Sequence, residues 1–238
     1  MSPHPSPNGR NPTCSLPTWH DGWVTTPMVI DIWSDVVCPF CYLGEVQLAK
    51  ALEAFAHSDQ VEIRTHAFEL DPSSAYNPDL ALDQLLADKY QMPLERAQTL
   101  HRDLEAKASD LGMHWSFAIA KPTNTFDAHR LIALARTQEL DATMVQRLFQ
   151  AYFSEGKLIS DRTVLNELAH EVGVVGVDQL GDGDQFADEV RVDEATAQGY
   201  GISGVPAMIF DGKYLVVGAQ GVEGYSRALE QTWAEREI

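Results

Sequence analysis

The 238-residue sequence has few cysteines, a shortage of basic residues and no long apolar run. Its three cysteines are too few for a small domain held together by disulfides. Lys and Arg number 17 against 35 Asp and Glu, which gives a formal charge of −18. A surface this acidic repels phosphate backbones and anionic lipids, so we expect neither nucleic acids nor membranes as partners. No stretch of about 18 apolar residues is present, which argues against a membrane-spanning helix.

The first 27 residues are rich in proline, serine and asparagine and show no hydrophobic periodicity. They lack the basic start, the apolar stretch and the small-residue cleavage site of a secretory signal. We therefore expect a loose extension over 1–27 and a cytoplasmic protein. Met28 stands directly before the first strand-like run, so we also expect it to be the physiological start, which the intact mass of the natural protein would test.

The remaining chain opens with a strand, a helix and a strand. Residues 28–34 are rich in β-branched and aromatic side chains and predict a short buried strand. Apolar residues at helical spacing, from Leu48 to Phe55, then predict an amphipathic helix. Residues 61–70 alternate between apolar and polar and predict the second strand.

The middle of the sequence, from about 79 to 172, has helical apolar spacing throughout. One segment starts near Pro93, and others follow Asn124, Asp141 and Asp161, which are residue types that cap helix N-termini. A run of four or five helices without strands predicts an all-helical insertion.

The last part of the chain again has both helix and strand patterns. Asp184 predicts the start of a further helix that ends near Gly199. The pair Asp211-Gly212 between two short apolar runs predicts a β-hairpin. A final helix is expected over about 222–233.

The strongest chemical signal is Cys38-Pro39-Phe40-Cys41, placed where the first strand gives way to the first helix. The N-terminus of a helix carries partial positive charge, so a Cys38 thiolate there is stabilised and nucleophilic near neutral pH. Pro39 suits the first helical turn, which needs no N–H at that position. Cys41 lies one turn behind, on the apolar side of the helix. We therefore expect Cys38 to attack and a buried Cys41 to resolve the mixed disulfide.

Two other interpretations of the cysteine pair are open. Both thiols could be structural and buried. A structural zinc site would need four ligands, and the third cysteine, Cys14, lies in the predicted extension. His20 and His57 stand at spacings that match no zinc pattern, so we expect no metal.

Val205-Pro206 is the second chemical signal in the sequence, after the cysteine pair. A proline directly before an apolar strand is a candidate for a cis peptide bond. One interpretation is a trans proline that starts the strand. The other places this turn against the cysteine pair.

Five short segments resemble the DsbA-type thiol–disulfide oxidoreductases of the thioredoxin superfamily, and within them the FrnE-like branch. They are 34–44 (SDVVCPFCYLG), 68–72 (FELDP), 124–131 (NTFDAHRL), 204–206 (GVP) and 218–220 (GAQ). The resemblance spans about 28–238. It implies an α/β fold, with a thioredoxin-like domain formed by 28–76 and 184–238 and interrupted by a helical insertion domain at 77–183.

The resemblance also implies a site. Cys38 and Cys41 would be the redox pair, and Pro206 would be cis and keep metals off the thiols. The Val205 backbone would pair with an extended substrate, beside Pro39 and Phe40. No resident cofactor is implied beyond the Cys38–Cys41 disulfide. The implied partners are protein or peptide thiols and disulfides, with glutathione as a possible co-substrate, and the oligomeric state stays open.

Three features separate this chain from relatives in the superfamily. Secreted DsbA oxidants carry a histidine between the cysteines, whereas Phe40 offers no charge, so we expect a less stabilised thiolate and a less oxidising couple. Some FrnE relatives have another cysteine pair near the C-terminus, and this chain has no cysteine after Cys41. The related 2-hydroxychromene-2-carboxylate isomerases and kappa-class glutathione transferases typically have serine in place of Cys38.

Several other residues have two interpretations each. His129 and Arg130 either face the active groove or form a pair on a helix surface. Asn124 is an N-cap that by resemblance also lines the groove. Asp31 is either an exposed residue at a sheet edge or a buried carboxylate that assists proton transfer to Cys41. Trp33 is expected in packing or along the groove, as is Phe40.

The sequence thus predicts a dithiol–disulfide oxidoreductase that works as a reductase or isomerase in a reducing compartment. Two alternatives remain. One is a glutathione-dependent isomerase or transferase in which Cys38 is a polar anchor. The other is a non-catalytic holdase chaperone whose apolar groove binds unfolded chains.

Overall fold

A computed structural model describes residues 1, 26–75, 81–181 and 183–236. Almost all of the predicted extension at 1–27 lies outside these residues. The elements in chain order are β1 (Met28–Ser34), α1 (Pro39–Glu53), a 3₁₀ turn (Ser58–Gln60), β2 (Val61–Ala67), α2 (Leu82–Lys89), α3 (Leu94–Asp110), α4 (Phe126–Arg136), α5 (Asp141–Phe153), α6 (Arg162–Val172), a 3₁₀ turn (Val177–Leu180), α7 (Ala187–Gly199), β3 (Ala207–Phe210), β4 (Tyr214–Val217) and α8 (Gly221–Ala234).

The four strands form one sheet in the order β2-β1-β3-β4. β1 and β2 run parallel, as the crossover through α1 requires, and β3 runs antiparallel to both β1 and β4. The predicted hairpin is confirmed. Its turn contains Asp211 and Gly212 at φ 52° and 67°, the left-handed region that an Asp-Gly pair accepts readily.

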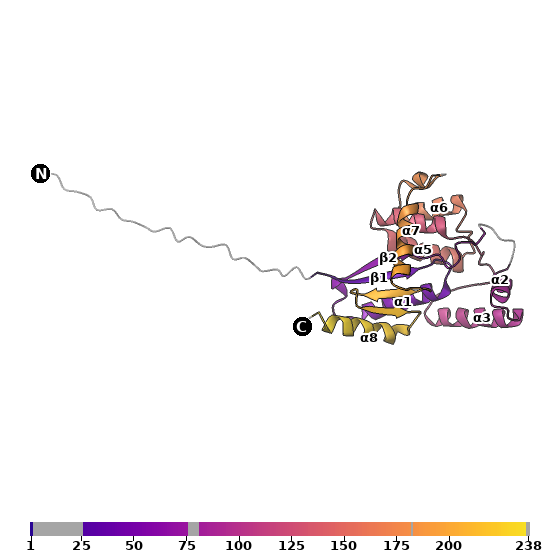
Figure 1. Cartoon of the computed structure of the whole chain (residues 1–238), viewed down its shortest axis with the longest axis horizontal. Helices are drawn as coiled ribbons and strands as arrows, with labels where there is room; N and C mark the ends of the chain where they lie inside the picture. Colours follow the sequence, from indigo (N-terminus) through magenta and orange to yellow (C-terminus); the bar gives the residue numbers. More distant parts are fainter. Residues whose placement is uncertain (2–25, 76–80, 182, 237–238) are drawn as a thin grey trace.

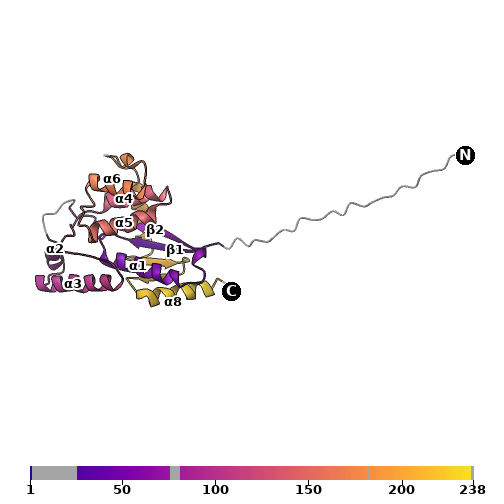
Figure 2. The ribbon, with the colours of Figure 1, turned by 180° about the vertical axis from the view of Figure 1, so that it is seen from behind.

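The sheet is covered on both faces (Figures 1 and 2). Helices α1 and α8 pack together on one face, over a cluster that contains Ile30 and Ile32 of β1 and Phe210 of β3. Helix α7 lies on the other face, where Trp33 packs with Ala197 and neighbours. This alternation along β1 follows from the period of two in a strand.

Between β2 and α7 the described residues contain only helices and one 3₁₀ turn, which confirms the predicted helical insertion. Helices α4, α5 and α6 pack around one apolar cluster, and α2 pairs with α3 beyond the end of α1 (Figure 2). The insertion cluster also contains Val36, Cys38, Cys41 and Leu43. The cysteine pair therefore lies where the thioredoxin-like part meets the insertion. The boundaries at 77 and 183 stay a prediction.

Three sequence predictions need correction. The helix expected from Asp184 begins at Ala187, because Phe186 takes a left-handed backbone at φ 62° immediately before it. The second strand ends at Ala67, three residues early. The helical spacing of apolar residues after Pro93 predicts that Leu100 is buried, but its side chain is 38% exposed because α3 is only partly covered.

Gly44 allows α1 to approach β3 and α8 closely. A Cβ added to Gly44 would lie 3.0 Å from the Tyr225 hydroxyl and 3.1 Å from Cγ of Pro206. Tyr225 is fully buried and donates its hydroxyl proton to the Gly218 carbonyl at 3.0 Å, so it cannot move without losing that bond. The fit of α1 against Pro206 thus depends on the missing side chain.

We predict that Gly44→Ala lowers the free energy of unfolding by about 1–3 kcal/mol through overpacking. Gly199→Ala is the matched control, since a Cβ at Gly199, in α7, meets nothing within 4 Å and gains helix propensity of up to about 1 kcal/mol. Urea denaturation followed by circular dichroism measures both. A Gly44→Ala variant as stable as the Gly199→Ala variant would contradict the close approach.

Candidate active site

Cys38 is the N-cap residue of α1, as its position in the sequence predicts. Its backbone is extended (φ −87°, ψ 114°), and its carbonyl accepts hydrogen bonds from the N–H groups of Cys41 and Tyr42 at 3.1 and 3.3 Å. Pro39 follows at the first helical position, and no acidic residue stands in the first turn. The partial positive charge of the helix end is therefore not neutralised by its own side chains.

Both cysteines are buried, Cys41 slightly more completely than Cys38. Cys41 has no exposed surface, and Cys38 retains 3%. Both are free thiols in this structure. Burial raises the pKa of Cys41 well above its ordinary value, and the neighbouring Cys38 raises it further, against smaller opposing effects of Asp35 and Ser34. Cys41 is therefore a protonated thiol near neutral pH, and only Cys38 has any exposed surface.

The loop before α1 is held through Asp35. Its carbonyl accepts from the Cys38 N–H at 3.0 Å, and its own N–H lies 3.5 Å from Sγ of Cys41. Its buried carboxylate accepts from the Leu70 N–H at 2.8 Å and lies 3.5 Å from Nε2 of His129. One residue thus fixes the backbone on which both sulfurs depend.

The Val205-Pro206 turn lies against the cysteines, and its peptide bond is cis, as predicted. The Cys38 thiol donates to the Val205 carbonyl at 3.7 Å. The Pro206 carbonyl accepts from the Gly218 N–H at 2.7 Å, which ties the turn to the end of β4. The pairing of a substrate with Val205 stays a prediction.

Phe40 and Trp33, which the sequence places either in packing or along the groove, lie on different sides of the sheet. Phe40 is 47% exposed beside the cysteines. Trp33 is buried on the other face of the sheet, where it stacks on His66 and donates its indole N–H to the Asp193 carbonyl at 3.0 Å. Phe40 can therefore meet a substrate, whereas Trp33 serves packing.

His129 and Arg130 are both buried, so the helix-surface interpretation is wrong. Arg130 donates to the carbonyls of Gln185 and Gly183 at 2.8 and 2.7 Å and secures the connection before α7. His129 faces Asp35 and so borders the active-site loop. Burial of two such polar residues requires these tertiary partners, which the sequence pattern does not show.

The prediction that Asn124 is the N-cap of α4 is wrong, because the helix begins at Phe126 and Thr125 occupies the cap position. Oδ1 of Asn124 accepts from the Phe126 N–H at 2.9 Å, and its amide donates to Glu69 and to the Pro72 carbonyl, both at 3.4 Å. These bonds engage both ends of its amide. A role in the substrate groove stays untested.

Neither interpretation of Asp31 holds. β1 is a central strand of the sheet, so Asp31 is not at an edge. Its Oδ1 lies 2.8 Å from Nε2 of His66, whose other nitrogen lies 2.7 Å from Asp193. Asp31 shares the face of Trp33, away from α1, and therefore cannot serve Cys41.

The sequence analysis missed a polar chain beside Cys41. The Ser34 hydroxyl donates to Oε1 of Glu45 at 3.0 Å, and Ser34 also opposes the raised pKa of Cys41. Oε2 of Glu45 accepts from the Gln146 amide at 3.0 Å. Burial raises the pKa of Glu45 to about 7, although the bonds from Ser34 and Gln146 oppose the shift. The spacing of four between Cys41 and Glu45 on one helix was the available signal, because such residues share a face.

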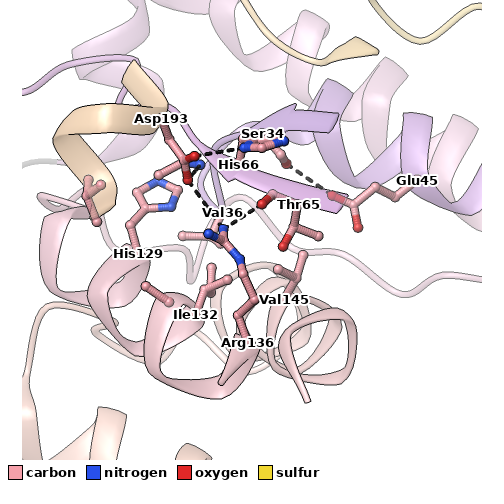
Figure 3. Close-up of a pocket in the computed structure, with 13 residues that line it drawn as sticks. Ser34, Val36, Glu45, Thr65, His66, His129, Ile132, Arg136, Val145 and Asp193 are labelled. Atoms are coloured by element: carbon pink, nitrogen blue, oxygen red, sulfur yellow. Dashed lines mark hydrogen bonds and ion pairs between the residues drawn. The ribbon is translucent and has the colours of Figure 1, made fainter. Parts of the chain in front are cut away.

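Glu45 and Ser34 line a pocket between the sheet and the helices α4, α5 and α7 (Figure 3). The figure shows Glu45 at one end and Asp193 at the other, with His129 and Arg136 along the insertion side. Within the described ranges, no cluster of three or more His, Cys, Asp or Glu residues is arranged to hold a metal ion. None of the described helices is long and apolar enough to cross a membrane.

Several solved structures are similar to this chain. A probable DsbA oxidoreductase from Streptomyces coelicolor is 36% identical, with a TM-score of 0.84 over 87% of this chain and 91% of its own. Two more distant structures share the fold. The cytosolic disulfide reductase DsbM of Pseudomonas aeruginosa is 20% identical (TM-score 0.60, 87% and 98% covered), and a 2-hydroxychromene-2-carboxylate isomerase is 16% identical (TM-score 0.66, 88% and 98% covered).

Proteins with different activities therefore share this fold, so the fold alone does not decide between disulfide exchange and isomerisation. The family model of the DSBA-like thioredoxin domain matches residues 29–230. Together with the thioredoxin-like sheet and its helical insertion, this match shows that the chain belongs to the DSBA-like thioredoxin domain family.

Proposed function

We propose that this protein is a dithiol–disulfide oxidoreductase that exchanges disulfides with protein or small thiols through Cys38 and Cys41. The observation that carries the proposal is the unequal placement of the two sulfurs. Cys38 caps the N-terminus of α1 and keeps some exposure, whereas Cys41 is fully buried one turn behind it. This asymmetry suits an attacking thiol and a resolving thiol.

The exchange proceeds in two displacements. The Cys38 thiolate attacks one sulfur of a substrate disulfide, and the other substrate sulfur leaves as a thiolate that takes a proton from water. Cys41 then loses its proton and attacks Sγ of Cys38. The Cys38–substrate bond breaks and the second substrate thiol is released. The substrate disulfide has then been reduced by two electrons, and the protein dithiol has been oxidised to the Cys38–Cys41 disulfide.

The exposed side of the site has an aromatic ring and the Val205 backbone, whose carbonyl accepts from the Cys38 thiol at 3.7 Å. Phe40 is 47% exposed, and Val205 is only partly buried next to Cys38. These groups suit an extended peptide or the peptide backbone of glutathione. With few cysteines in the chain, we place the activity in the cytoplasm, where reduction or isomerisation of disulfides is favoured over net oxidation.

We predict that Cys38→Ser abolishes insulin reduction, because no nucleophile remains at the helix end. Cys41→Ser should instead accumulate a mixed disulfide with glutathione that mass spectrometry detects, because nothing resolves it. Cys14→Ser, the only other cysteine substitution the chain offers, should leave turnover within about twofold of wild type.

The same variants separate the alternatives. Isomerase turnover that persists in Cys41→Ala would favour a glutathione-dependent isomerase or transferase. Suppressed aggregation by Cys38→Ser, with no insulin reduction by the wild-type protein, would favour a holdase. Either result would overturn the proposed redox function.

We predict that Phe40→His makes the redox couple more oxidising. A ring N–H beside Cys38 stabilises the thiolate and hence the reduced form, and about 1.4 kcal/mol corresponds to about 30 mV for this two-electron couple. Phe40→Leu is the control without a polar atom. Equilibration with glutathione buffers measures both potentials, and equal values for the two variants would contradict the electrostatic argument.

A further inference from the structure

We propose that Tyr225 of α8 and Gln47 of α1 are positioning residues that hold the Val205-Pro206 turn where a peptide substrate of Cys38 needs it. They act through residues 218–220, which join β4 to α8 and which we call the β4–α8 connection. The inference rests on the proposed redox function, because it concerns how a peptide disulfide is held while Cys38 attacks it.

Gly218 is the residue through which the turn is held. Its N–H donates to the Pro206 carbonyl at 2.7 Å, and its carbonyl accepts from the Tyr225 hydroxyl at 3.0 Å. The directions of these two groups are set by a left-handed backbone at φ 79°, a conformation that favours glycine. A displacement at the Tyr225 hydroxyl is therefore passed to Pro206 through one residue.

The Tyr225 side chain is a firm support for this residue. It is fully buried and belongs to the apolar cluster that contains Met208 of β3 and Leu229 of α8. A ring packed at this density has little room to swing. Burial also raises the pKa of Tyr225, so its hydroxyl keeps its proton and remains a donor. The Gly218 carbonyl is thus held at a fixed place relative to the sheet and α8.

Gln47 ties the β4–α8 connection to the helix that carries the cysteines. Its Oε1 accepts from the N–H of Gly221, the first residue of α8, at 2.9 Å. Helices α1 and α8 pack together along their length (Figure 2). Because Cys38 is the N-cap of α1, this bond fixes the connection relative to the reacting sulfur as well as to the sheet.

The Val205-Pro206 turn lies between these supports and Cys38. The Cys38 thiol donates to the Val205 carbonyl at 3.7 Å. Pro206 and the Tyr225 hydroxyl both lie against α1 at Gly44, where an added Cβ would be 3.1 Å from the proline Cγ and 3.0 Å from the hydroxyl oxygen. The place of the turn relative to the sulfur therefore follows from the helix, the ring and the connection together.

This placement matters more for a peptide than for a small disulfide. A thiolate has no proton to donate, so ionisation of Cys38 leaves the Val205 carbonyl open to an N–H of an extended substrate. Such backbone pairing tolerates only a narrow range of donor–acceptor distances. A small disulfide has no backbone to pair and needs only the sulfur. Tyr225 and Gln47 thus set the preference of the site for peptides.

The test compares two reagents that release the same leaving group. One is dithionitrobenzoate, and the other is a peptide whose single cysteine is joined to thionitrobenzoate by a disulfide. The Cys38 thiolate attacks the peptide sulfur and forms a Cys38–peptide disulfide, while the bond to thionitrobenzoate breaks with its electron pair on the leaving thiolate. Stopped-flow absorbance of thionitrobenzoate gives a half-saturating peptide concentration, a limiting rate and the rate constant for dithionitrobenzoate.

In Tyr225→Phe we expect the half-saturating peptide concentration to rise about tenfold, because the Gly218 carbonyl loses its support. The limiting rate should change by less than about threefold, since binding and not chemistry is affected. The preference for the peptide over dithionitrobenzoate should fall by the same factor as binding. Tyr214→Phe is the matched control, because the Tyr214 hydroxyl donates to Glu235 at the other end of β4, and it should keep the wild-type preference.

Gln47 provides a second pair of variants. Gln47→Leu removes the acceptor for the Gly221 N–H and should raise the half-saturating peptide concentration. Gln47→Glu keeps a side-chain oxygen there, and the N-terminus of α8 favours its negative charge, so we expect the wild-type value. Rescue by glutamate but not by leucine separates the hydrogen bond from the packing of the side chain.

The outcomes separate the two proposals. A wild-type protein that releases no thionitrobenzoate from either reagent contradicts the redox function itself. Normal release with equal half-saturating concentrations in Tyr225→Phe and Tyr214→Phe overturns the positioning role alone, as does a wild-type reaction that does not saturate with the peptide. An equal fall with both reagents also overturns it, since the cysteine pair is then disturbed directly. If Tyr225→Phe does not fold, equal values in Gln47→Leu and Gln47→Glu overturn the inference.

Discussion

The site depends on how the four-residue loop before α1 is held. Asp35 binds the N–H of Cys38 through its carbonyl and lies against the Cys41 sulfur through its N–H. Its carboxylate is in turn fixed by Leu70 and faces His129. Because these groups are buried, each bond is stronger than it would be in water and costly to lose. The positions of both sulfurs relative to the helix end follow from this one residue.

The helical insertion forms part of the site, because its helices pack directly around the two cysteines. Cys38 and Cys41 belong to the same apolar cluster as the helices α4, α5 and α6. That packing removes Cys41 from water and thereby raises its pKa. The same burial leaves Cys41 with no surface exposed to solvent. Glu45 is bound on one side by the core strand and on the other by the insertion, so it links the two parts beside the cysteine helix.

The fold alone leaves the chemistry open, since solved structures of a disulfide reductase and of an isomerase share it. In this chain a second thiol lies behind the first, and the carbonyl beside the cis proline turn lies 3.7 Å from the Cys38 sulfur. Function in such a family is therefore a property of the few groups around one helix end. The Gly44 contact with Pro206 and Tyr225 shows how closely the scaffold holds them.

Local patterns in the sequence determined the strand–helix junction at Cys38, the run of helices in the middle and the Asp211-Gly212 hairpin, because each depends on residues near in the chain. The placement of Val205-Pro206 against the cysteines followed from family resemblance. Only the tertiary structure joined Ser34 with Glu45, and Glu45 with Gln146 across 101 positions. It also paired Asp31 with His66 and buried His129 beside Asp35. The physical reason is that a polar side chain is assigned its partner by packing between distant elements, which no periodicity encodes.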